Sequence, residues 1–113
     1  MEVLGPAGSS RGDREVFTDY YAAVGLPTKG TIKTSSDHAP FMEAGIPVGW
    51  LFTGTNKLKT AREAEVYGGT AGVPYDACYH QPCDNLDNVS TTALNQTSDG
   101  AAHATLTLAN RVY

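Results

Sequence analysis

The sequence predicts one α/β domain, because helix-like and strand-like patterns alternate within 113 residues. A chain of this length corresponds to one domain, since domains usually contain about 100–200 residues. Residues 46–52 form a nearly continuous apolar run, which is typical of a strand that is covered on both faces. Residues 14–24 instead repeat large apolar side chains at every fourth position, which predicts an amphipathic helix. The preceding residues 1–12 are expected to form a loop.

Start and stop signals predict the elements of the first half. Asp13 is expected to cap the first helix, which should end before Gly25. A short strand is expected at residues 30–34. Ser36 is then expected to cap a short helix that ends at Gly45, directly before the apolar strand.

Two further helices are expected in the second half. Thr60 and Glu63 have the spacing of a capping box, which predicts a helix that runs to about Tyr67. The last helix should begin near Ser90, although Gly100 within it lowers the helix propensity. Between them, residues 68–88 are rich in Gly, Pro, Asp and Asn. Loops this long in compact domains are usually functional or disordered.

Charge and hydrophobicity exclude several function classes. The formal net charge is −4 and the sequence pI is near 5.1, so nucleic acid is excluded as the main partner, because phosphate binding needs a basic face. No apolar run approaches the about 20 residues of a spanning helix, and no membrane partner is expected. The first six residues do not show the basic and apolar regions of a signal peptide.

The densest chemical signal is the segment 78–83, CYHQPC, which contains both cysteines of the chain. In one interpretation, Cys78 and Cys83 form a disulfide that closes a tight loop and presents Tyr79 and His80, and this would indicate an oxidising compartment. In the other, the cysteines and His80 hold a zinc ion. Structural zinc needs four ligands, usually with two to four residues between paired cysteines, and the chain has no further cysteine, so a fourth ligand would have to be His38, His103 or a carboxylate. We favour the disulfide.

Six short segments keep the order and spacing of one known pattern across most of residues 16–110. They are, in order, residues 36–41 (SDHAPF), 44–49 (AGIPVG), 51–54 (LFTG), 67–72 (YGGTAG), 75–84 (YDACYHQPCD) and 98–104 (SDGAAHA). Together they resemble the secreted bacterial zinc aminopeptidases of metallopeptidase family twenty-eight. The resemblance implies a three-layer α/β/α zinc-exopeptidase fold around a mixed sheet, in a protein that is secreted.

The resemblance also implies roles for individual residues. Two zinc ions share five protein ligands in such enzymes, and the last of these ligands corresponds to His80, within the Cys78–Cys83 disulfide loop. Tyr79 would help to stabilise the tetrahedral intermediate. Phe52 would help to line the pocket for the N-terminal side chain of a peptide substrate. The residue after Gly49 is usually small in the family, whereas here it is Trp50, which would narrow or reshape that pocket.

The length of the chain limits this interpretation. A catalytic domain of the family is more than twice as long, and its other zinc ligands and its general-base glutamate lie before the matched segments. We therefore expect residues 1–113 to form the C-terminal part of such a domain, which is incomplete and inactive alone. Its partner would be the missing N-terminal part or a second copy of the chain. The alternatives are a non-catalytic peptide-binding module and a small structural zinc-binding domain.

Overall fold

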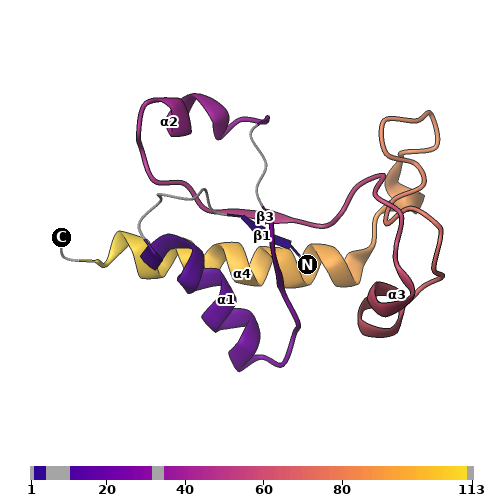
Figure 1. Cartoon of the computed structure of the whole chain (residues 1–113), viewed down its shortest axis with the longest axis horizontal. Helices are drawn as coiled ribbons and strands as arrows, with labels where there is room; N and C mark the ends of the chain where they lie inside the picture. Colours follow the sequence, from indigo (N-terminus) through magenta and orange to yellow (C-terminus); the bar gives the residue numbers. More distant parts are fainter. Residues whose placement is uncertain (1, 5–10, 32–34, 112–113) are drawn as a thin grey trace.

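The computed structural model describes residues 2–4, 11–31 and 35–111 of the chain (Figure 1). The described part is elongated, with extents of 43 × 30 × 27 Å and a radius of gyration of 15.0 Å. A compact domain of this length would have a radius of about 13 Å. The elements in order are β1 (Glu2–Leu4), α1 (Arg11–Ala23), β2 (Lys29–Thr31), α2 (Ala39–Glu43), β3 (Trp50–Phe52), α3 (Ala61–Tyr67), a 3-10 turn (Leu86–Asn88) and α4 (Thr91–Ala109).

The three strands form one mixed sheet in the order β2-β1-β3. The central strand β1 is parallel to β2 and antiparallel to β3, with Glu2 opposite Phe52 and Leu4 opposite Trp50. The mixed sheet agrees with the expected α/β class. The expected loop over residues 1–12 is wrong for Glu2–Leu4 and for the start of α1, because pairing with strands distant in the sequence makes this tripeptide a strand.

The core lies between α1, α4 and the sheet. Four hydrophobic residues are buried in the described part of the chain, namely Val16, Phe17, Tyr21 and Ala104. Leu51 of β3 packs against them from the sheet. Figure 1 shows α1 and α4 on one side of β3 and the five-residue α2 on the other. A full helical layer on that second side, and with it the three-layer arrangement, stays a prediction.

Several boundaries differ from the expected ones. Helix α1 begins at Arg11, so that Asp13 lies inside the helix. The N-cap of α2 is His38, and Ser36 instead accepts a hydrogen bond from Ala39 through its backbone carbonyl, at 2.9 Å. The apolar run forms a strand only over its last three residues, because Pro47 has no N–H to donate to a ladder.

The expected strand at residues 30–34 is found one residue earlier, as β2, and residues 32–34 lie outside the described part. Helix α1 ends as expected before Gly25, whose positive φ of 74° closes the C-terminus.

The helices of the second half agree with their signals. The capping box of α3 is complete, since Thr60 Oγ1 accepts from the Glu63 N–H at 3.1 Å and the Thr60 N–H donates to Glu63 Oε2 at 2.9 Å. Ser90 caps α4 by accepting from the Ala93 N–H at 3.2 Å. Among the described residues, no helix has the length and apolar character needed to span a bilayer.

Candidate functional site

The segment with the densest chemical signal forms a closed ring. Cys78 and Cys83 are joined by a disulfide, with their α-carbons 5.3 Å apart, which confirms the pairing favoured from the sequence. Inside the ring, the Gln81 N–H donates to the Cys78 carbonyl at 2.8 Å. The alternative in which both cysteines and His80 hold one zinc ion is wrong for this structure, because sulfur in a disulfide is not available as a thiolate ligand.

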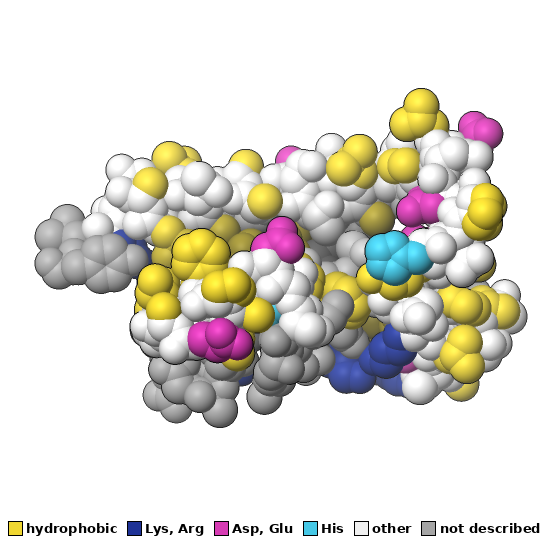
Figure 2. Space-filling view, turned by 90° about the horizontal axis from the view of Figure 1, so that it is seen from above, with side chains coloured by type: hydrophobic (Ala, Val, Ile, Leu, Met, Phe, Trp, Pro, Cys, Tyr) yellow, Lys and Arg dark blue, Asp and Glu magenta, His cyan; other side chains and the backbone are white. Residues whose placement is uncertain are grey.

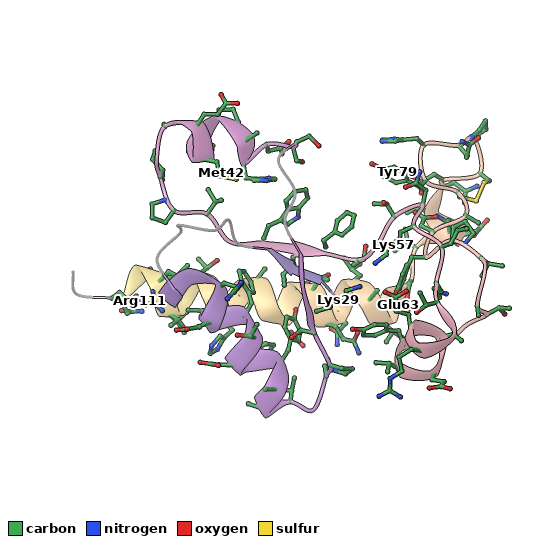
Figure 3. All side chains as sticks on the ribbon, in the orientation of Figure 1. Lys29, Met42, Lys57, Glu63, Tyr79 and Arg111 are labelled. Carbon is green, nitrogen blue, oxygen red and sulfur yellow. A yellow bond between two sulfur atoms is a disulfide. The ribbon has the colours of Figure 1, made fainter. Side chains whose placement is uncertain are left out.

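The ring presents Tyr79 and His80 together. The centroids of their side-chain rings are 3.9 Å apart and the ring planes are tilted by 42°. Tyr79 is half-buried and His80 is exposed, and Figure 3 shows Tyr79 and the yellow disulfide bond on the same loop. His80 has a positive φ of 56°. A left-handed conformation costs about 1–2 kcal/mol for a residue with a Cβ, and such strain gathers at functional sites.

Three polar side chains hold the two ends of the ring. Asp76 Oδ1 accepts from the Cys78 N–H at 2.9 Å and from Asn88 Nδ2 at 3.0 Å. Asn88 Nδ2 also donates to Asp84 Oδ1, at 3.1 Å. The carboxylates before Cys78 and after Cys83 are therefore joined through one side-chain amide.

A short ladder connects this loop to the segment that follows β3. The N–H of Tyr75 donates to the Lys57 carbonyl at 3.0 Å, and the N–H of Asp76 donates to the Thr55 carbonyl at 2.7 Å. Gly54 lies two residues after the end of β3 and is buried. A Cβ at this position would meet the Tyr75 ring at 2.5 Å. The close approach of Tyr75 to the Gly54 backbone therefore holds the start of the disulfide loop near the end of β3.

The side chains of β3 form an aromatic surface on the sheet. Because Leu51 packs into the core, its neighbours Trp50 and Phe52 point to the opposite face. Their rings meet edge to face at 5.8 Å, and the His38 ring lies 4.4 Å from Trp50. Figure 1 shows that α2 and the disulfide loop flank this side of β3, and Figure 2 views this side from above, with hydrophobic side chains in several separate groups among the white atoms.

A cluster of charges ties α3 to the strand β2 and to the segment between β3 and α3. Glu63 is buried, and its Oε1 lies 3.4 Å from Lys29 Nζ and 3.2 Å from Lys57 Nζ. Figure 3 shows these three side chains close together. The hydrogen bond from the Thr60 backbone, together with that from Lys57, lowers the pKa of Glu63 from 4.5 to about 2. The Glu63 carboxylate therefore stays ionised down to strongly acidic pH.

Comparison with known proteins identifies the family. The sequence profile of Peptidase family M28 matches residues 8–105, which is most of the chain. The chain belongs to this peptidase family. The family resemblance stated from the sequence motifs is therefore confirmed.

Individual members of the family align over most of the chain. It is 50% identical over 98 residues to leupeptin-inactivating enzyme 1 of Streptomyces exfoliatus, which covers 83% of this chain and 22% of that protein. It is 44% identical over 113 residues to an aminopeptidase of Pseudomonas aeruginosa, with 97% and 21% covered. It is 42% identical over 111 residues to a probable leucine aminopeptidase 2 of Aspergillus fumigatus, with 97% and 22% covered. The chain thus spans about a fifth of the length of these relatives.

The resemblance implies five metal ligands, and the described residues do not bring such a set together. Within the described residues, His, Cys, Asp and Glu form no group of three or more that could hold a metal ion. A single imidazole such as His80 cannot hold two zinc ions, because each needs about four ligands. The described part of this family member therefore does not supply the whole two-zinc centre by itself.

The sequence placed Tyr79, His80 and the disulfide in one ring, and the structure brings Tyr79 and His80 together. Phe52 lies on the sheet, beside Trp50. The bridging role of Asn88 was missed, because its partner Asp76 is 12 residues away and no local pattern links them. The sequence signal for this role of Asn88 was only its position in a long polar loop, of a length that is usually functional or disordered.

Proposed function

We propose that this chain is the C-terminal part of the catalytic domain of a zinc-dependent aminopeptidase, which removes N-terminal residues from peptides. The observation that carries the proposal is the disulfide ring that presents Tyr79 and a strained His80, in a chain that belongs to a peptidase family. The names of the relatives, which include aminopeptidases, support the same reaction class.

The proposed roles follow from the chemistry of each side chain. An exposed neutral imidazole on a pinned ring is a sound zinc ligand, and His80 would supply one ligand to a centre completed by further polypeptide. Zinc, when bound, makes hydroxide available from water near neutral pH. Tyr79, adjacent to His80, would donate its phenol O–H to the oxyanion that develops on the substrate. Phe52 would contact the N-terminal side chain of the peptide.

The completing polypeptide would join the chain at β3. This strand is an edge of the described three-stranded sheet, and edge strands are templates for further pairing. A hollow of about 520 Å³ lies beside it, lined by Leu51, Phe52, Thr97 and Ala101 among others. The small core and elongated shape support an added segment, either the remainder of the domain or a second copy of the chain. The disulfide supports a secreted protein.

Complementation tests the proposal. Oxidised chain is mixed with the Pseudomonas aeruginosa aminopeptidase from which the segment matching this chain has been deleted, and zinc-dependent release from an aminoacyl chromogenic substrate is measured. We expect turnover only from the mixture and at least a hundredfold less with His80→Ala. The matched control is His103→Ala, an exposed histidine on α4. Turnover by the chain alone, or equal turnover with His80→Ala, contradicts the proposal.

A second candidate is a peptide-binding module without catalysis. The aromatic surface of Trp50, Phe52 and His38 favours it, because such a surface can contact an apolar side chain without any metal. Fluorescence of Trp50, the single tryptophan of the chain, would report peptide binding. Binding that is unchanged by a chelator and by His80→Ala, without turnover in the complementation mixture, would favour this candidate.

A further inference from the structure

We infer that Asn88 is a positioning residue for the candidate site, and that its side-chain amide keeps Tyr79 and His80 in the geometry that presents them together. That this geometry matters for a reaction rests on the proposed function. The juxtaposition itself rests on the contacts of Asn88 Nδ2, which donates to Asp76 Oδ1 at 3.0 Å and to Asp84 Oδ1 at 3.1 Å.

These contacts close a second link across the disulfide ring. Asp76 lies two residues before Cys78 and accepts its N–H at 2.9 Å. Asp84 follows Cys83 directly, and its own N–H donates to the Gln81 carbonyl at 2.9 Å. The ring is therefore joined once by the covalent S–S bond and once by the hydrogen-bonded bridge through Asn88. A ring joined by two links has less freedom to rotate Tyr79 and His80 than one closed by the disulfide alone.

An amide is the side chain that this bridge requires. Its nitrogen carries two hydrogens and can serve two acceptors, whereas an ionised carboxylate of the same shape has none. The amide also separates Asp76 from Asp84, two groups of like charge that bind the same nitrogen. Hydrogen bonds to charged groups are stronger than those between neutral groups, so the loss of both should loosen the disulfide ring.

The bridge through Asn88 matters because it helps to hold the strained backbone conformation of His80. A residue with a Cβ holds a φ of 56° only when its surroundings determine that conformation. Asn88 ends the 3-10 turn that leads into the Ser90 cap of α4, and its N–H donates to the Asn85 carbonyl at 3.0 Å. The bridge thus ties the ring to the start of the longest helix, which is the rigid element nearest to it in the chain.

The test uses the isosteric variant Asn88→Asp in the full chain, with two readouts that need neither zinc nor substrate. The first is the NMR shift of the His80 imidazole protons, which the Tyr79 ring current displaces. The second is the equilibrium of the Cys78–Cys83 disulfide with glutathione. We expect the His80 shifts to move toward random-coil values and the disulfide to become about tenfold easier to reduce. Asn95→Asp, an exposed position on α4, is the matched control and should change neither.

A second variant decides the outcome if Asn88→Asp does not fold. Asp84 is exposed, and Asp84→Ala removes one half of the bridge while leaving the Asn88 bond to Asp76. We expect the same two changes at about a third of the size on a fold-change scale, and no change for Asp87→Ala, an exposed acid of the same loop. Wild-type shifts and glutathione equilibrium in Asp84→Ala and in any folded Asn88→Asp would overturn the inference. Because both readouts ignore turnover, they can succeed or fail independently of the complementation assay.

Discussion

The phenol oxygen of Tyr21 lies directly against the backbone of Gly100, so that α1 and α4 meet where α4 has no side chain. Tyr21 is fully buried, and its hydroxyl donates to the Gln96 carbonyl at 2.8 Å. Burial, more than its charged neighbours, raises the pKa of this phenol. The glycine that weakens α4 by propensity is therefore the residue that lets the two helices approach.

This contact predicts that Gly100→Ala destabilises the chain, although alanine is the better helix former by about 1 kcal/mol. The added Cβ would overlap Tyr21, and overpacking of this kind costs about 1–3 kcal/mol. In the Tyr21→Phe background the nearest overlapping atom is gone, so the same change should cost less. Urea unfolding of the four members of this double-mutant cycle measures the coupling, and additive effects would contradict the contact.

The depressed pKa of Glu63 predicts an acid-dependent loss of stability. Because the folded-state pKa is about 2 and the ordinary value is 4.5, the charged cluster contributes fully above about pH 4.5. Its contribution should fall as the pH drops from there toward 2. Glu63→Gln keeps the capping-box geometry but not the charge, and should flatten the stability curve in this range. Glu65→Gln, at an exposed ion pair with Arg62, is the control and should keep the wild-type slope.

Gly54 is predicted to be intolerant of any side chain. Its φ is 105°, and a Cβ there would meet the Tyr75 ring. Gly54→Ala should therefore add a steric cost to a backbone cost, for a loss of about 2–4 kcal/mol. Gly72 also has a positive φ, of 81°, but nothing lies within 4 Å of a Cβ added there. Gly72→Ala should therefore lower the free energy of unfolding by only about 1 kcal/mol. Equal losses in chemical denaturation would show that the Tyr75 contact does not matter.

We predict that the backbone conformation of His80 lowers the stability of the folded chain. At a φ of 56°, His80→Gly should be more stable than His80→Ala by about 1 kcal/mol, because glycine adopts this conformation without a Cβ clash. The neighbouring Gln81 does not share the positive φ, and there glycine should be no better than alanine. Thermal unfolding of the four variants checks both statements. A more stable alanine at position 80 would remove the argument from strain.

The sequence by itself determined the features that a few neighbouring residues can specify. The capping box of Thr60 and Glu63, the Gly25 terminus of α1 and the Cys78–Cys83 ring each depend on donors, acceptors or sulfurs within a few positions. Such signals are readable because the partners arrive together once the local backbone is set. The motif order added the family, which the profile match then confirmed.

Only the tertiary structure decided the rest, because it depends on partners that are distant in the chain. The strand Glu2–Leu4 has no periodicity of its own and exists through pairing with β2 and β3. The role of Asn88 depends on its hydrogen bond to Asp76. The role of Gly100 depends on its contact with Tyr21, whose hydroxyl donates to a carbonyl 75 residues away. Long-range packing and hydrogen bonds determine these pairs, and local sequence patterns do not show which distant surfaces will meet.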